Sequence, residues 1–187
     1  GNDVYYVNHI GDNVVELDGQ GNDSIYASVN YSLGGRFAET LILTGTGDLQ
    51  ALGNASANSL VGNSGNNMLN GFQGSDTLTG GAGQDQFRFT TALGTGNIDT
   101  ISDFVAIDDS IALSKAVFAA LGALGTLGTD AFVAGAQAAD ASDRIIYNSL
   151  NGTLLYDADG TGSGAATVFA HIGTGLTLTH DDFLIIA

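Results

Sequence analysis

Glycine, an Asn or Asp, and an apolar residue recur every nine positions between residues 53 and 88. Four nonapeptides follow one another there without an insertion, beginning at Gly53, Gly62, Gly71 and Gly80. Every unit has Asn or Asp in its sixth place and Leu or Phe in its eighth, and three units have glycine in the fourth. Glycines at places one, two and four allow positive φ, so six residues can form a tight turn. Because Ca²⁺ prefers carboxylate and carbonyl oxygens, the spacing predicts calcium-binding turns.

Short strands must position these turns. The last three residues of each unit are expected to be extended, with the eighth-place residue pointing inward. Since each turn reverses the chain, two units close one coil, and the turns of alternate units stack about 4.8 Å apart. Asn58 should then lie over Asp76 on one side, and Asn67 over Asp85 on the other.

Carboxylates stacked at that spacing repel one another unless a cation lies between them. We therefore interpret the turns as calcium sites. The alternative is a metal-free solenoid with asparagine ladders, which carries more weight at individual turns than over the whole stretch because Asn58 and Asn67 each remove a charge. The candidate ligands in the repeats are Gly53, Asn58, Gly62, Gly65, Asn67, Gly71, Gly74, Asp76, Gly80, Gly81, Gly83 and Asp85.

A looser version of the same pattern precedes the repeats. Residues 18–26 fit the nonapeptide, with Asp18 in place of the first glycine. Gly19, Gly21 and Asp23 are therefore further candidate ligands, and a solvated turn is the alternative. Strands are predicted at residues 4–7, over the alternating segment 25–33, and at residues 41–43.

Three aspartates after residue 88 extend the candidate site. Counting by nines from Gly80 puts Asp103 in the sixth place of a unit that starts at residue 98, over Asp85, so the calcium ladder is expected to continue by one step. Asp99 and Asp103 are alternatively the polar half of an alternating strand. Asp109 either supplies a ligand or belongs to a turn.

The segment from residue 110 onward is predicted to cap the roll. Residues 114–121 begin with an N-cap serine followed by helix-forming residues, so one short helix is expected there. Its Val117, Phe118 and Leu121 would cover the apolar end of the last coil. Residues 122–140 are predicted to form a loop.

The remaining chain predicts strands. Residues 144–147 and 153–156 are expected to form a β-hairpin. Residues 157–162 begin like an EF-hand loop, but Val168 occupies the place of the required glutamate, which favours a hairpin turn instead. Further strands are predicted over 166–172 and in the terminal segment, which places an acidic pair before an apolar run.

The predicted fold class is therefore all-β. We expect a parallel β-roll, a calcium-binding solenoid, with flanking β-strands and a C-terminal cap that contains one short helix and a β-hairpin. Three regions are expected: degenerate repeats over 1–52, the β-roll over 53–109, and the capping region over 110–187.

Composition restricts the partners. Twenty acidic and four basic side chains give a formal net charge of −16, which disfavours nucleic acids and anionic membranes and favours bound cations. The same charge opposes compaction of the metal-free chain, so folding should depend on metal. The chain has no cysteine, and it has no apolar run long enough to span a bilayer. It shows no N-terminal signal peptide and opens on the back half of a repeat, so we expect a C-terminal piece of a larger protein.

These segments together resemble the C-terminal part of RTX, or haemolysin-type, calcium-binding proteins. The nonapeptides carry the resemblance; residues 99–104 with 109–114 are similar to the segment after the repeats in serralysin-like C-terminal domains, and residues 182–186 resemble the end of type I secretion substrates. The resemblance implies several bound Ca²⁺ ions and calcium-driven folding outside the cell. It also implies export from a Gram-negative bacterium by the type I secretion machinery, guided by an uncleaved signal in residues 179–187.

Three functions compete. The first is a calcium-binding folding and secretion module. The second is a polysaccharide or cell-surface binding module, for which the six tyrosines could stack on sugars. The third, catalysis, is disfavoured because His9, His171 and His180 are scattered and no H-E-x-x-H, G-x-S-x-G or cysteine nucleophile is present. Enzymatic activity, such as that of a protease, lipase or epimerase, would belong to the larger protein.

Overall fold

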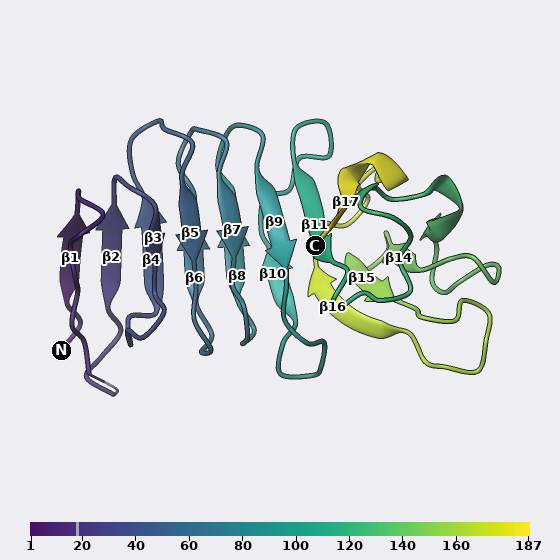
Figure 1. Cartoon of the computed structure of the whole chain (residues 1–187), viewed down its shortest axis with the longest axis horizontal. Helices are drawn as coiled ribbons and strands as arrows, with labels where there is room; N and C mark the ends of the chain where they lie inside the picture. Colours follow the sequence, from purple (N-terminus) through teal and green to yellow (C-terminus); the bar gives the residue numbers. More distant parts are fainter. Residues whose placement is uncertain (18) are drawn as a thin grey trace.

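Short strands and regularly spaced turns build two facing sheets with a cap at one end (Figure 1). The computed structural model describes residues 1–17 and 19–187, so Asp18 lies outside the described residues. One sheet has ten strands in the order β1-β2-β4-β6-β8-β10-β16-β15-β14-β13. The other has seven in the order β12-β17-β11-β9-β7-β5-β3. The all-β, stacked parallel architecture confirms the predicted fold class.

The strands are only two to five residues long. The ten-stranded sheet contains β1 (Val4–Val7), β2 (Ser24–Ala27), β4 (Thr40–Leu43), β6 (Ser59–Val61), β8 (Thr77–Thr79), β10 (Asp99–Ile101), β13 (Phe132–Ala134), β14 (Ile145–Asn148), β15 (Thr153–Tyr156) and β16 (Thr167–His171). The seven-stranded sheet contains β3 (Tyr31–Ser32), β5 (Gln50–Leu52), β7 (Met68–Asn70), β9 (Gln86–Phe89), β11 (Ser110–Ser114), β12 (Gly125–Thr126) and β17 (Phe183–Ile186). Two 3-10 turns, η1 (Thr129–Ala131) and η2 (His180–Asp182), complete the elements.

The register confirms the predicted coil. Strand β6 pairs in parallel with β8, and Leu60 lies beside Leu78. In the opposite sheet β7 pairs in parallel with β9, and Leu69 lies beside Phe87. Each partner is 18 residues further along the chain, so two nonapeptides form one coil.

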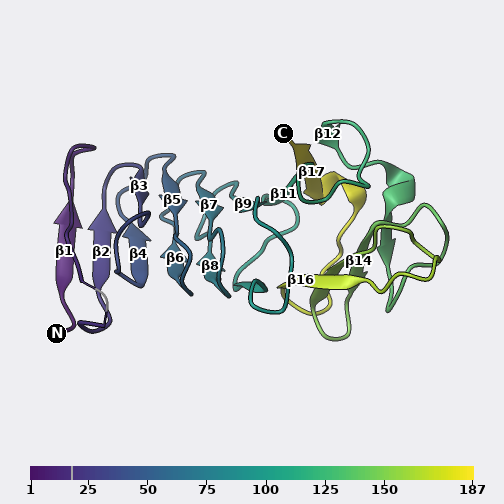
Figure 2. The ribbon, with the colours of Figure 1, turned by 60° about the horizontal axis from the view of Figure 1, so that its bottom comes forward.

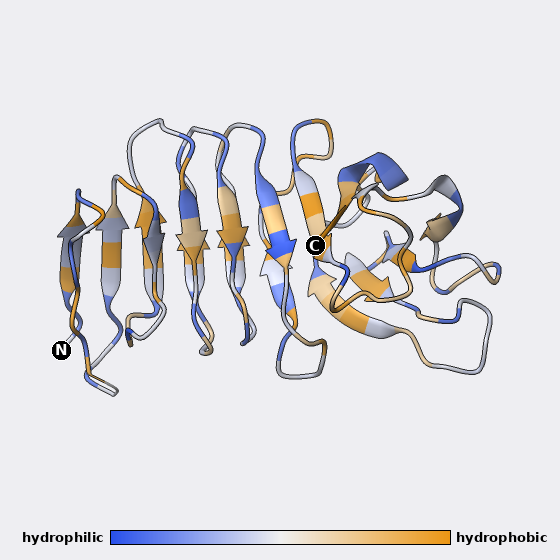
Figure 3. Ribbon diagram, in the orientation of Figure 1, coloured by the Kyte–Doolittle hydropathy of each residue, from blue (hydrophilic) through white to orange (hydrophobic). Residues whose placement is uncertain are grey.

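Two ladders of apolar side chains fill the space between the sheets. The members of both ladders are fully or almost fully buried, and Figure 3 shows apolar bands on successive strands. Each Leu, Ile or Phe side chain among them stabilises the fold by about 1.5–3 kcal/mol. The ladders are Ile25, Leu41, Leu60, Leu78 and Ile101, and opposite them Ala51, Leu69, Phe87, Ile111 and Phe183.

Antiparallel strands continue the ten-stranded sheet into the cap, which lies beyond the last coil in both views (Figures 1 and 2). Strands β14 and β15 form the predicted hairpin, with Ile145 paired to Tyr156. Strand β16 runs antiparallel to β15, which confirms that residues 157–166 form a hairpin connection. Strand β17 lies beside β11 and adds a strand to the seven-stranded sheet.

The helix predicted over residues 114–121 is wrong. Ser114 ends β11, and the backbone N–H of Lys115 donates to Ile186 O at 2.8 Å, which continues the strand ladder. The following residues form turns, with Phe118 N bonded to Ser114 O. An isolated helix of eight residues is unstable without packing, and here packing favours turns that bury Phe118 and Leu121.

Aromatic side chains join the cap to the last coil. Phe118 lies edge-on to Phe169 and to Tyr156, with ring centroids 5.2 and 5.1 Å apart, and Phe169 lies edge-on to Phe89 at 5.1 Å. Such pairs contribute about 0.5–1.5 kcal/mol beyond their area burial. The cap therefore covers the apolar end of the roll as predicted, without the helix.

Two other expectations need correction. The alternating segment 25–33 is not one strand: β2 and β3 lie in opposite sheets, although the alternation of buried residues continues through the bend between them. Residues 122–140 are not only a loop, because β12, η1 and β13 form there and Phe132 packs on Phe183 with ring centroids 5.4 Å apart. In the part of the chain that the structure describes, no helix is long and apolar enough to cross a membrane.

Candidate metal centre

The turns of successive coils stack in two columns along the edges of the roll (Figure 1). The first column contains the turns 33–39, 53–58, 71–76 and 90–98, and the second contains the turns 44–49, 62–67, 80–85 and 102–109. Within a repeat, the sixth-place residue is the last of the turn and directly precedes a strand. Strand pairing therefore fixes the height of each sixth-place side chain.

Backbone hydrogen bonds connect the sixth places of successive coils. The N–H of Asn58 donates to Oδ1 of Asp76 at 2.7 Å, and the N–H of Asn67 donates to Oδ1 of Asp85 at 2.7 Å. Both predicted stacking pairs are therefore confirmed. The direction is constant: an N–H of one coil meets the carboxylate of the next.

The second oxygens of Asp76 and Asp85 have no hydrogen-bond partner among the described residues. Both side chains are buried, with exposed fractions of 2% and 1%, and both Oδ2 atoms are inaccessible. Burial raises the pKa of each carboxyl to about 6, although the backbone hydrogen bond on Oδ1 lowers it. A buried carboxylate oxygen without a donor is costly and calls for an ion or a proton.

The ladders continue through Asp99 and Asp109. The N–H of Asp76 donates to Oδ1 of Asp99 at 3.0 Å, and that of Asp85 donates to Oδ1 of Asp109 at 2.9 Å. Burial, followed by the charge of Asp76, raises the pKa of Asp99 to about 7. Burial also raises the pKa of Asp109. The two columns thus each contain carboxylates in consecutive coils.

The predicted place of Asp103 is wrong. Pairing of Ile101 with Leu78 puts Asp103 over Gly80, at the first place, and its carboxylate accepts the N–H groups of Gly80 and Gly81 at 2.8 Å each. Asp109 lies over Asp85 instead, because the turn 102–109 has one residue more between these two places than a repeat has.

Glycine at the first place is required by close approach and not, as predicted, by positive φ. A Cβ on Gly53 would lie 2.5 Å from the carbonyl oxygen of Gly71 in the next coil. A Cβ on Gly62 would likewise meet the carbonyl oxygen of Gly80, whereas on Gly71 and Gly80 it would meet the carboxylates of Asp76 and Asp85 in the same turn. None of the four glycines has positive φ. Positive φ occurs at the second and fourth places instead, at Gly74, Gly81 and Gly83, while Gly65 packs at the fourth place against the backbone of the preceding coil.

The sixth-place asparagines are already satisfied on their oxygens. Oδ1 of Asn58 accepts the N–H of Asn54 at 2.8 Å, and Oδ1 of Asn67 accepts that of Asn63 at 2.6 Å. Both side chains are buried. These two turns therefore differ from the two that follow, in which the corresponding oxygens have no donor.

A second carboxylate cluster lies at the N-terminal end of the roll. Asp23, a predicted ligand, comes together with Asp3 and Glu16, each with an oxygen within 4.8 Å of the others. Asp23 accepts the N–H of Asp3 at 2.7 Å, and Glu16 accepts the hydroxyl of Tyr5, which raises the pKa of Tyr5 to about 12. Gly19 and Gly21 have positive φ in the adjoining turn.

Sequence reasoning missed Asp3 and Glu16. The sequence does indicate Asp3, because the triplet Gly-Asn-Asp occurs at residues 1–3 and again at residues 21–23. Strand β1 pairs with β2 in the corresponding register. Glu16 had none: it is buried because the segment after the first turn places Val14 and Glu16 inward, whereas Val15 is exposed.

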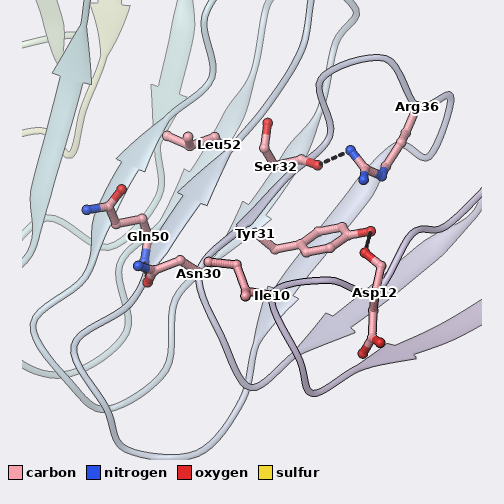
Figure 4. A pocket seen from close by; sticks show the side chains of 8 residues that line it. All are labelled: Ile10, Asp12, Asn30, Tyr31, Ser32, Arg36, Gln50 and Leu52. Carbon is pink, nitrogen blue, oxygen red and sulfur yellow. Dashed lines mark hydrogen bonds between the residues drawn. The ribbon is translucent and has the colours of Figure 1, made fainter.

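A hollow of about 240 Å³ lies beside β3 and β5 (Figure 4). Tyr31 forms its floor, and the guanidinium of Arg36 lies over the ring, 4.9 Å from its centroid. Arg36 also donates to Ser32 O and Gly34 O at 3.1 Å each. Tyr31 is buried, so this ring is not available for stacking on a sugar.

The remaining tyrosines differ in exposure. Tyr147 and Tyr156 are buried in the cap, whereas Tyr6 is 79% exposed and stacks on Tyr26 with ring centroids 5.4 Å apart. Among the histidines, Nδ1 of His9 accepts the N–H of Gly11 within its own turn.

A family model confirms the nature of the repeats. The model of the RTX calcium-binding nonapeptide repeat matches residues 52–87 in four copies. The nonapeptides at 53–88 are therefore RTX calcium-binding repeats, and the match includes the turns of Asp76 and Asp85. No curated protein matches the chain.

Proposed function

We propose that the RTX calcium-binding repeats make this chain a module that folds when it binds Ca²⁺. The observation that carries the proposal is the pair of buried oxygens, Asp76 Oδ2 and Asp85 Oδ2, that have no donor among the described residues. Hard oxygen ligands at a buried, negatively charged position suit Ca²⁺, which takes six to eight oxygens at about 2.3–2.6 Å. The bound ion would supply the positive charge that these turns lack.

Binding to the folded chain alone would couple calcium to stability. The chain has a net charge of −16, and electrostatic repulsion between its carboxylates opposes compaction when no metal is bound. A ligand that binds only the folded state stabilises it by RT ln(1 + [L]/Kd). Asp76 and Asp85 are the ligands best supported by their surroundings. The other predicted ligands, in the turns 19–23, 53–67 and 99–109 and at the glycines of the turns 71–76 and 80–85, stay predictions.

We also propose that the module works outside the cell. Calcium sites of extracellular modules bind at about 10⁻⁴–10⁻³ M, so even weak sites would fill there and stay empty in the cytosol. The likeness of residues 182–186 to the end of type I secretion substrates supports export through that machinery, with residues 179–187 as the signal. Fusion of residues 110–187 to a reporter, expressed with a type I exporter, tests this: a reporter retained inside the cell contradicts it.

Glycan binding is the second candidate. The exposed Tyr6 ring, stacked on Tyr26, offers a flat aromatic surface of the kind that sugars stack on. Binding of the chain to polysaccharides, lost in Tyr6→Ala and kept in the buried Tyr147→Phe, would support it; equal binding by both variants would count against it.

Far-UV circular dichroism tests the main proposal. The calcium-depleted chain should give a disordered spectrum and gain β signal as Ca²⁺ is added, whereas Mg²⁺ at the same concentration should have much less effect. A full β spectrum in chelator would show that folding does not depend on calcium.

A further inference from the structure

The four RTX turns are built in two different ways, and the turn 62–67 shows the first. The side-chain N–H groups of Asn63 donate to the carbonyl oxygens of Thr44 and Gly47 in the preceding coil, at 3.1 Å each. The backbone N–H of Asn63 donates to Oδ1 of Asn67, and Nδ2 of Asn67 donates back to Oδ1 of Asn63 at 3.1 Å. Amide groups of the protein thus join this turn to the preceding coil.

The turn 53–58 repeats the arrangement in the other column. Nδ2 of Asn54 donates to Arg36 O at 2.9 Å and to Leu33 O at 3.4 Å, both in the preceding coil. The backbone N–H of Asn54 donates to Oδ1 of Asn58 at 2.8 Å. Among the buried side-chain nitrogen and oxygen atoms that the structure describes in this turn, only Nδ2 of Asn58 has no partner; it is a hydrogen-bond donor and gains nothing from a cation.

The turns 71–76 and 80–85 are built in the second way. Their second-place residues, Phe72 and Gly81, have φ of 68° and 96°. Neither can reach the preceding coil with an amide side chain. Phe72 is a non-glycine residue in the left-handed region, a conformation that is unfavourable for an L-residue and persists only where the surroundings impose it.

In the two turns with positive φ at the second place, the backbone N–H of the second-place residue does not donate to the sixth-place side chain. The N–H of Phe72 donates to Oδ1 of Asn70 at 3.1 Å, and the N–H of Gly81 donates to Oδ2 of Asp103 at 2.8 Å. The oxygens Asp76 Oδ2 and Asp85 Oδ2 therefore have no donor, although they lie beside the first-place glycine as the asparagine oxygens do.

The carbonyl oxygens of the preceding coil show the same difference. Thr44 O and Gly47 O are occupied by the amide of Asn63. One coil further on, Gly62 O and Gly65 O hold the equivalent places, and no hydrogen bond to either is found within the described residues. Beside the turn 80–85, three oxygens with no N–H partner thus replace a set of amide hydrogen bonds.

We infer that Ca²⁺ binds at the turns 71–76 and 80–85, whereas in the turns 53–58 and 62–67 the amides of Asn54 and Asn63 take the place of the ion. The inference rests on the calcium-binding function proposed above. According to this inference, the turns 53–58 and 62–67 form without a bound ion, and the turns 71–76 and 80–85 of the next coil require one.

Counting bound ions on the full chain tests this assignment. Equilibrium dialysis with Ca²⁺, followed by metal analysis, gives the number of ions per chain. The double substitution Asn63→Gly/Asn67→Asp gives the second and sixth places of turn 62–67 the residue types found in turn 80–85 and should add one ion. Asp85→Asn, which preserves shape, should remove one. Ser64→Asp adds a charge at an exposed position of the same turn and should leave the number unchanged.

The outcomes separate the inference from the function. An unchanged number of ions in Asn63→Gly/Asn67→Asp, with Ca²⁺ bound by the unaltered chain, would mean that the asparagine turn already holds an ion and would overturn the inference alone. Loss of an ion in Asn63→Ala would do the same. Absence of bound Ca²⁺ in the unaltered chain would refute the proposed function instead.

Discussion

The roll and the cap both bury aspartates, but they satisfy them differently. In the cap, Asp143 accepts the N–H groups of Ala139 and Asp140 at 2.7 and 3.0 Å, and Asp157 accepts those of Asp159 and Gly160 at 3.1 and 3.0 Å. Backbone donors are thus provided by the same loops that carry the carboxylates.

In the roll, Asp76 and Asp85 each keep one buried oxygen without a donor. Hydrogen bonds to charged groups contribute about 1.5–3 kcal/mol, and a missing partner costs at least as much. We therefore expect the roll and the cap to depend on metal to different degrees, although they share one continuous ten-stranded sheet. Backbone N–H groups of the cap bind its buried carboxylates. In the RTX turns, the second oxygens of Asp76 and Asp85 have no such donor among the described residues, so a cation or a proton is expected there.

Removing calcium should produce the largest difference between the two regions. In chelator, we expect the amides of β8 and β9 to lose most of their protection from hydrogen exchange, because the turns 71–76 and 80–85 that precede these strands lose the ions that offset carboxylate repulsion. The hairpin β14–β15 should retain more protection. Hydrogen-exchange mass spectrometry with and without chelator measures both regions at once, and equal losses in both would remove the distinction.

Shortening a core residue should cost several kcal/mol in the presence of saturating calcium. Leu78→Ala in the roll should lower the free energy of unfolding by about 2–5 kcal/mol, and Phe118→Ala in the cap by about 3–5 kcal/mol. Both side chains are fully buried. Thr77→Ala, at the neighbouring exposed position, serves as the control. Denaturant titration measures the change, and a cost below that of the control would show that Leu78 is not part of the core.

Replacing an aspartate should affect calcium affinity in the roll and only stability in the cap, where the carboxylates accept backbone N–H groups. Asp76→Asn should raise the calcium concentration at the folding midpoint by about tenfold, which corresponds to 1.4 kcal/mol. Asp157→Asn in the cap should reduce stability and leave calcium binding itself unchanged. Calorimetric titration with Ca²⁺ distinguishes the two, and an equal loss of affinity in both variants would show that the cap also takes part in binding.

Local sequence encodes the repeat and its core. Glycine in the first place, Asn or Asp in the sixth and a large apolar residue in the eighth each serve one coil, so a period of nine predicts the strands, the inward side chains and the pairs Asn58–Asp76 and Asn67–Asp85. The same pattern places Asp76 and Asp85 at the candidate site before any coordinates are known.

Contacts between coils and changes of turn length are not encoded in that period. Counting by nines misplaced Asp103 because the turn 90–98 is longer than the turn 71–76 of the preceding coil, so Asp99 takes the sixth place and Asp103 lies over Gly80. The amide of Asn63 reaches carbonyl oxygens of the preceding coil, which no pattern within its own unit indicates. The segment 114–121 has helical residues, but pairing of β11 with β17 and burial of Phe118 decide its conformation.

The smallest effect concerns protons that replace calcium. Burial raises the pKa of Asp76 and Asp85 to about 6 and that of Asp99 to about 7 in the folded chain, above the value of about 3.9 for an unfolded aspartate. The folded state therefore binds more protons than the unfolded state between about pH 4 and pH 7, and its stability rises as the pH falls through this range.

Calcium-free protein should accordingly be more stable at pH 5 than at pH 7.5, and its affinity for Ca²⁺ should be lower at pH 5 because protons and Ca²⁺ compete for the same oxygens. Far-UV circular dichroism of the dialysed chain at the two pH values measures the first effect, as a larger β signal at pH 5 than at pH 7.5. In Asp76→Asn/Asp85→Asn the gain on acidification should be smaller, since two of the groups that take up protons are gone. A calcium-free chain that loses stability between pH 7.5 and pH 5 would show that the buried carboxylates of the roll are not what calcium neutralises.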